Sequence, residues 1–120
     1  AGGEEHIKLE VGGVTINEGG QPNDFRIEGD TDTFLFFVDG SADKVGIGTS
    51  TPTALLDVDG TIKTKVHTIG ALPSASPAGQ RAMVSDSYYT FGSSSLGSTV
   101  YAGGSAVAPV YSDGSYWRYG

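Results

Sequence analysis

The sequence has no cysteine among its 120 residues, and no apolar run in it approaches the length of a membrane-spanning helix. Without cysteine, neither a disulfide framework nor a thiolate metal site can stiffen the fold. Without about 18 consecutive apolar residues, no segment can cross a bilayer as a helix. We therefore expect a soluble protein with no membrane partner.

Large apolar side chains are also scarce. Ile, Leu, Val and Phe account for 27 residues, whereas Gly, Ser and Ala account for 42. Ile, Leu, Val and Phe thus make up about 23% of the chain, close to the ~20% level below which chains tend to be disordered. Ordering each residue costs about 1–2 kcal/mol of backbone entropy, which so few large side chains offset only marginally within one chain. We expect other copies of the chain to supply the missing burial.

Basic residues are few in the first half of the chain. Residues 1–60 carry 12 acidic and 3 basic side chains, whereas residues 61–120 carry 2 acidic and 4 basic ones. An acidic half repels the phosphates of nucleic acids and favours solubility or contact with a basic neighbour. No nucleic acid partner is expected.

Apolar residues repeat at helical spacing over no more than one turn, so the predicted fold class is all-β. At most one helical turn is expected, around Thr53–Leu56. Short antiparallel strands and hairpins are predicted in two small β modules, residues 1–70 and 71–120. The boundary falls at about residue 71 because residues 72–79 contain two prolines and mostly small side chains, which predict a linker or an extended crossing segment.

The strands are marked by alternating apolar and polar residues. One hairpin is predicted over residues 6–18 with Gly12-Gly13 as its turn, and another over residues 110–119 with its turn at Asp113-Gly114. The other predicted strands lie at residues 25–28, 33–38, 55–58, 61–69, 81–86, 100–102 and 107–111.

The run from residue 33 to residue 38 is apolar on both faces of a strand. Phe34, Phe36 and Val38 are predicted to project one way. Leu35 and Phe37 are predicted to project the other way. Such a strand needs cover on both sides, and with few other large side chains in the chain we expect one cover to be a second subunit.

Residues 39–60 organise the chain, because they alternate polar turns with very short apolar strands. The glycines of Gly46-Ile47-Gly48 do not form a nucleotide loop, since neither a third glycine opening a helix nor a Gly-Lys-Ser/Thr sequence follows. They are expected where strands of adjacent subunits pass closely or where the backbone bends. Val45 and Ile47 share one face, and the predicted subunit interface comprises Phe34, Leu35, Phe36, Phe37, Val45 and Ile47.

Two groups of carboxylates have a spacing that could suit a functional site. Glu28, Asp30 and Asp32 could ligate calcium, but the other ligands of a calcium loop do not follow at the required spacing, so a solvated turn is favoured. Asp57 and Asp59 share a strand face, as a glycosidase pair would. No aromatic sugar platform lies next to them in sequence, and surface charge is favoured.

The two histidines, His6 and His67, lie far apart in the sequence, and neither belongs to a His-x-His pair. His67 could bind a metal on a threefold axis, but a free surface histidine is favoured. No Ser-His-Asp set can be assembled. We therefore predict no catalytic, cofactor-binding or metal-binding residue, and expect that the protein is not an enzyme.

The aromatic C-terminus is the best candidate for recognition of a ligand. Tyrosine and tryptophan offer large contact area with polar tips, which suits a sugar or a protein. The candidate residues are Tyr111, Tyr116, Trp117 and Tyr119. The favoured alternative is that Trp117 forms the core of a module that has few other large residues.

Three stretches resemble the surface-fibre structural proteins of tailed bacteriophages, both tail fibres and head fibres. The most specific is Val45-Gly46-Ile47-Gly48-Thr49-Ser50-Thr51-Pro52 followed by Leu56-Asp57-Val58. The others are residues 24–30 leading to residues 35–39, and residues 72–86 together with residues 109–114 and Trp117. The resemblance implies strands interlocked in a homotrimer about a threefold axis.

The resemblance further implies a non-enzymatic structural component of the virion surface, forming a trimeric tail fibre, head fibre or spike. Because the chain is short for a long fibre rod, a capsid decoration (cement) trimer remains an alternative, and a carbohydrate-binding module is the alternative from another class. The implied partners are further copies of the chain, other virion proteins of the capsid or tail, and a host-surface glycan.

Overall fold

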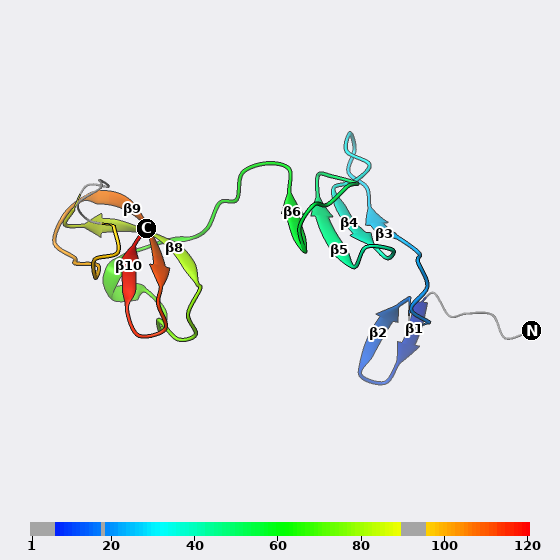
Figure 1. Cartoon of the computed structure of the whole chain (residues 1–120), viewed down its shortest axis with the longest axis horizontal. Coiled ribbons are helices and arrows are strands. Elements are labelled where there is room, and N and C mark those ends of the chain that lie inside the picture. Colours follow the sequence, from blue (N-terminus) through cyan, green and yellow to red (C-terminus); the bar gives the residue numbers. More distant parts are fainter. Residues whose placement is uncertain (1–6, 18, 90–95) are drawn as a thin grey trace, which may run out of the picture. The chain divides into compact units, whose positions relative to one another are not determined.

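The structure is a computed structural model that describes residues 7–17, 19–89 and 96–120. The prediction made for His6 lies outside these residues. The described chain forms ten strands and one short 3-10 helix, so the all-β prediction is confirmed (Figure 1). The chain divides into two compact units, Ala1–Ile62 and Lys63–Gly120. No described helix is long or apolar enough to span a bilayer.

The N-terminal unit begins with an antiparallel hairpin of β1 (Ile7–Glu10) and β2 (Gly13–Ile16). The predicted hairpin is present, but its turn is Val11-Gly12, since Gly13 already pairs with Glu10. Gly12 has φ +117°, a conformation that side chains disfavour, and this places the turn one residue earlier than predicted.

A four-stranded sheet follows in the order β3-β4-β5-β6. Its strands are β3 (Phe25–Ile27), β4 (Phe36–Asp39), β5 (Lys44–Ile47) and β6 (Leu56–Val58). The strands β3, β4 and β5 run antiparallel in succession, but β6 runs parallel to β5. The segment between them crosses over without a helix: the predicted helical turn around Thr53–Leu56 is a series of bends.

The C-terminal unit contains a second four-stranded sheet in the order β10-β9-β8-β7. Its strands are β7 (Val66–His67), β8 (Arg81–Ser87), β9 (Ala106–Ser112) and β10 (Trp117–Tyr119), with β7 parallel to β8. The 3-10 helix η1 (Ile69–Ala71) follows β7. The buried core of this unit comprises Val84, Ala108, Val110, Trp117 and Tyr119.

The division between the units lies several residues before the predicted boundary at about residue 71. Residues 61–65 are not a strand, and only Val66 and His67 of the predicted strand 61–69 pair, with Met83 and Val84. This pairing assigns β7 to the C-terminal unit.

The proline-containing segment 72–79 belongs to the C-terminal unit and is not a free linker. The Trp117 indole N–H donates to the Pro73 carbonyl (2.8 Å), and the Ser112 hydroxyl donates to the Pro77 carbonyl (3.0 Å). Leu72 and Ala75 pack against the core. Prolines suit this position because the segment satisfies its carbonyls with side chains of the sheet and needs few backbone donors.

The predicted C-terminal hairpin is confirmed, with Ser112 of β9 opposite Trp117 of β10. Asp113 holds its turn: the carboxylate accepts the backbone N–H groups of Ser115 (2.8 Å) and Tyr116 (2.7 Å) and the guanidinium of Arg118 (2.6 Å). The Tyr116 N–H, followed by Arg118 and the Ser115 N–H, lowers the pKa of Asp113 to about 2. The folded state therefore favours the charged form of this carboxyl.

Because the pKa of Asp113 is lower in the folded chain than in the unfolded chain, its contribution to stability is present above the ordinary value of 3.8 and is lost as the pH falls towards 2. We expect the stability difference between the wild type and Asp113→Asn to shrink over this range. Carboxyl NMR titration and acid unfolding followed by Trp117 fluorescence measure both effects. A titration midpoint of Asp113 at or above the ordinary value would contradict this assignment.

Candidate functional site

One side of the β3–β6 sheet carries only large apolar side chains. The strand register places residues opposite one another on the same side, because side chains alternate along each strand. We call this side the apolar face; it consists of Phe25, Ile27, Phe36, Val38, Val45, Ile47, Leu56 and Val58. Not one of these eight side chains is buried in the structure. The described part of the chain thus covers this face only in part.

The opposite side of the sheet, the covered face, is closed by the chain itself. Phe37 is only 5% exposed, and the ring of Phe34 meets it edge-on with centroids 5.3 Å apart. The Gly48 N–H donates to the Phe34 carbonyl (3.0 Å) and ties the two covering turns together. Among the described residues of the N-terminal unit, Phe37 is the only large apolar residue that is buried.

Gly46 lies on the covered face for a local steric reason. A Cβ atom at this position would collide with the carbonyl oxygen of Thr49 in the same chain. Gly48 has φ +73°, in the left-handed region that favours glycine. Both glycines therefore serve the turn after β5 within the subunit, so close passage of a neighbouring subunit is not needed to explain them.

The six residues predicted as a subunit interface are divided between the two faces. Phe36, Val45 and Ile47 lie on the apolar face, whereas Phe37 lies on the covered face. Leu35 lies in the turn before β4 and is exposed.

The prediction that Phe34 shares a face with Phe36 is wrong, because β4 begins only at Phe36. The Asp32 carboxylate accepts the Phe34 N–H (2.8 Å), and this turn swings the Phe34 ring onto Phe37. The guanidinium carbon of Arg26 lies 5.6 Å from the centre of the Phe34 ring on the same side.

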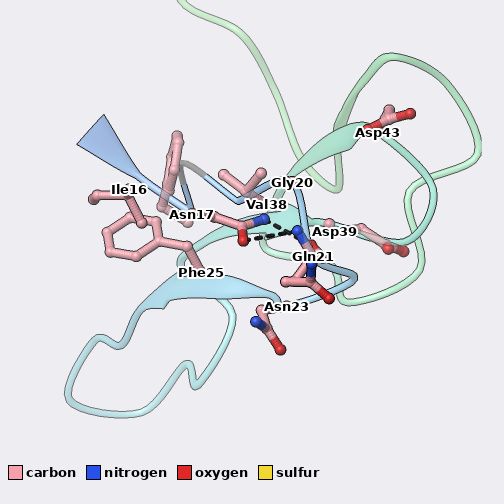
Figure 2. Close-up of a pocket in the computed structure, with 11 residues that line it drawn as sticks. Ile16, Asn17, Gly20, Gln21, Asn23, Phe25, Val38, Asp39 and Asp43 are labelled. Carbon is pink, nitrogen blue, oxygen red and sulfur yellow. Dashed lines mark hydrogen bonds between the residues drawn. The ribbon is translucent and has the colours of Figure 1, made fainter. Parts of the chain in front are cut away.

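A groove of about 440 Å³ opens on the apolar face beside β3 and β4. Figure 2 shows the residues that line it. Phe25, Phe36 and Val38 line it with apolar surface. One wall is the loop after β2, where the Asn17 side chain donates to the Gln21 carbonyl (2.7 Å) and accepts the Gln21 N–H (3.1 Å). Sequence reasoning identified this loop only by its composition and missed the groove.

Two acidic residues, Asp39 and Asp43, line the groove at the turn between β4 and β5. The Asp39 carboxylate accepts the Ser41 hydroxyl (2.7 Å) and the N–H groups of Ser41 (2.9 Å) and Ala42 (2.8 Å). The Ser41 hydroxyl is the main cause of the lowered pKa of Asp39. This side of the groove therefore holds negative charge at neutral pH.

The other candidate carboxylates and His67 make local contacts. Asp57 accepts the N–H and the hydroxyl of Thr53, both at 2.7 Å, and the Thr53 N–H is the main cause of its lowered pKa. Glu28 forms an exposed ion pair with Arg26 (2.7 Å). His67 Nδ1 lies 3.2 Å from the Ala71 carbonyl oxygen. Within the described ranges, no three acidic or histidine side chains gather as a metal site would require.

The aromatic residues of the C-terminus do not form one exposed surface. Trp117 and Tyr119 are core residues at 8% and 1% exposure, which fits the core interpretation and does not fit a recognition role. The Tyr119 hydroxyl donates to the Tyr101 carbonyl (3.2 Å), so even its polar tip is used internally. Tyr116 is exposed beneath the Arg118 guanidinium, and Tyr111 is half-buried.

Comparison of the chain with protein families, with curated proteins and with solved structures gave no match.

Substitution of Gly46 tests the covered face. We expect Gly46→Ala to destabilise the N-terminal unit by about 1–3 kcal/mol, because the added methyl group overlaps the Thr49 carbonyl and the turn must shift. Gly60→Ala is the matched control, since a Cβ there meets nothing within 4 Å. Hydrogen exchange of the β4 and β5 amides reports on this unit. Equal protection in the two variants would contradict the packing described.

Proposed function

We propose that this chain is a non-enzymatic structural subunit of a bacteriophage virion surface, and that it assembles as a homotrimer through the apolar face of the β3–β6 sheet. The observation that carries self-assembly is that face: eight large apolar side chains on one side of a well-paired sheet, none of them buried. The assignment to a virion is supported by the resemblance of residues 45–52 and 56–58 to phage surface fibres.

The free energy to be gained by burying the apolar face supports assembly. Complete burial of one Val, Leu, Ile or Phe side chain contributes roughly 1.5–3 kcal/mol. Ile27 and Leu56 are about half exposed and the other six side chains are exposed to a smaller extent, so completing their burial would gain on the order of 5 kcal/mol per chain, a large part of the stability of a small domain. Contiguous apolar surface of this kind marks an interaction site in soluble proteins.

A second copy of the chain fits this surface better than an unrelated cover. A sheet with one apolar face needs a second layer, and on that side the described chain provides only part of one, from the loop after β2. Three copies whose apolar faces turn towards a common axis each cover the others with the same eight residues. Closed cyclic symmetry of this kind also limits growth into open filaments.

The carboxylates support a structural role. Asp39, Asp57 and Asp113 each accept hydrogen bonds from a neighbouring turn, so their charge is used to hold backbone geometry. Of the alternatives, a capsid decoration trimer would use the same assembly face. Recognition of a glycan by the aromatic C-terminus is not favoured by any contact, because Trp117 and Tyr119 are in the core.

Light scattering tests the assembly. The wild-type chain is expected at about three times its mass of 12.3 kDa. Ile47→Asp is expected to abolish the trimer, because a carboxylate on the apolar face would be buried without a partner at a cost of several kcal/mol.

Thr61→Asp provides the matched control, since Thr61 is exposed after β6 and lies outside the apolar face. This variant is expected to remain trimeric. A monomeric wild type at micromolar concentration, or a trimer that tolerates Ile47→Asp, would overturn the proposal.

A further inference from the structure

Two adjacent exposed leucines lie at the β6 edge of the β3–β6 sheet, Leu55 just before β6 and Leu56 within it on the apolar face. Leu55 is 77% exposed and Leu56 is 59% exposed, although both belong to a well-held segment. The Leu55 carbonyl accepts the Val45 N–H (2.9 Å), and Leu56 pairs with Val45 across the parallel ladder. The Asp57 carboxylate fixes the preceding turn through Thr53. These contacts hold two apolar side chains in solvent on a rigid backbone, which lowers the entropy cost of docking them.

The groove lies near the other edge of the same sheet. Phe25 on β3 and Phe36 and Val38 on β4 line it, and β5 separates these strands from β6. Neighbouring strands are about 4.8 Å apart, so β4 and β6 are separated by roughly 10 Å within the sheet. The leucines of a chain therefore project at a different edge from the groove of that chain.

We propose that Leu55 and Leu56 of one copy insert into the groove of the next copy around the trimer. This inference rests on the self-assembly proposed above and names its contact. A projection and a groove at different edges of one unit make a head-to-tail interface, and such an interface closes into a ring when each copy is rotated by one third of a turn. The apolar groove surface and the two leucines are matched in polarity.

The charges favour this pairing over a contact of groove with groove. Residues 51–56 contain no charged side chain, and the nearest carboxylate, Asp57, lies opposite Gly46 on the covered face and binds Thr53. The leucine segment therefore brings less negative charge to Asp39 and Asp43 than a second groove would. Two grooves facing each other would instead bring the acidic residues of both copies together, which is unfavourable. Asp39 in particular keeps its charge, because its pKa is lowered by the Ser41 hydroxyl.

Disulfide trapping tests the contact, and the absence of native cysteine makes each trapped bond unambiguous. The double variant Leu55→Cys with Ile16→Cys places one thiol on the projection and one in the groove. After oxidation, we expect covalently linked dimers and trimers on a non-reducing gel. Each single-cysteine variant should stay unlinked, because neither position then meets a copy of itself.

A matched control combines Ile62→Cys with Ile16→Cys, since Ile62 is also a highly exposed apolar residue but lies outside the leucine segment. It is expected to stay unlinked. Light scattering of each reduced variant shows whether the trimer is intact, and Val38→Cys replaces Ile16→Cys if that substitution disturbs assembly. Linkage in the control equal to that in the double variant would mean that trapping is non-specific and would overturn the contact.

The outcomes separate the two proposals. A trimer whose double variant stays unlinked or forms a disulfide only within one chain overturns insertion into the groove, while the proposed assembly stands. Linked dimers from Leu55→Cys alone also overturn it, because they place Leu55 next to its own copy. A monomeric wild-type chain overturns the proposed assembly itself and the groove contact with it.

Discussion

The N-terminal unit depends on the edge-on contact between Phe34 and Phe37, with ring centroids 5.3 Å apart. This contact closes the covered face of the sheet with a turn of the same chain. Phe37 is the only large apolar side chain that is buried among the described residues of this unit. Every other large apolar residue in the four strands falls on the opposite side, because strand alternation permits no third direction. An open apolar face follows directly from closing the other one.

The two units differ in how much of a buried core each forms, because they place their large apolar residues differently. The C-terminal unit gathers Val84, Val110, Trp117 and Tyr119 into one cluster and adds the proline-containing segment as a cover held by hydrogen bonds from Trp117 and Ser112. Its core is therefore formed within the chain. The N-terminal unit spreads its apolar residues over a single sheet layer, and a single layer cannot enclose a core.

The acidic character of the first half is organised at turns. Asp32, Asp39 and Asp57 each accept a backbone N–H within a few residues of themselves, which replaces hydrogen bonds that short strands and turns do not provide. Asp113 repeats the arrangement in the C-terminal hairpin. A chain with so few large apolar side chains thus fixes its turns by carboxylate acceptors, which hold the short strands of the apolar face in register.

The sequence alone determined the all-β class, both hairpins and the two-sided apolarity of β4, because alternation, Gly-containing turns and the lack of helical periodicity are local properties. The tertiary structure decided what depends on residues distant in sequence. The parallel pairing of β5 with β6 arises from a crossover, the burial of Trp117 requires the carbonyl of Pro73, and the groove forms only where the loop after β2 meets Phe25 and Phe36. The turn at Phe34 also breaks the strand alternation on which its predicted face relied, since a turn residue obeys no period of two.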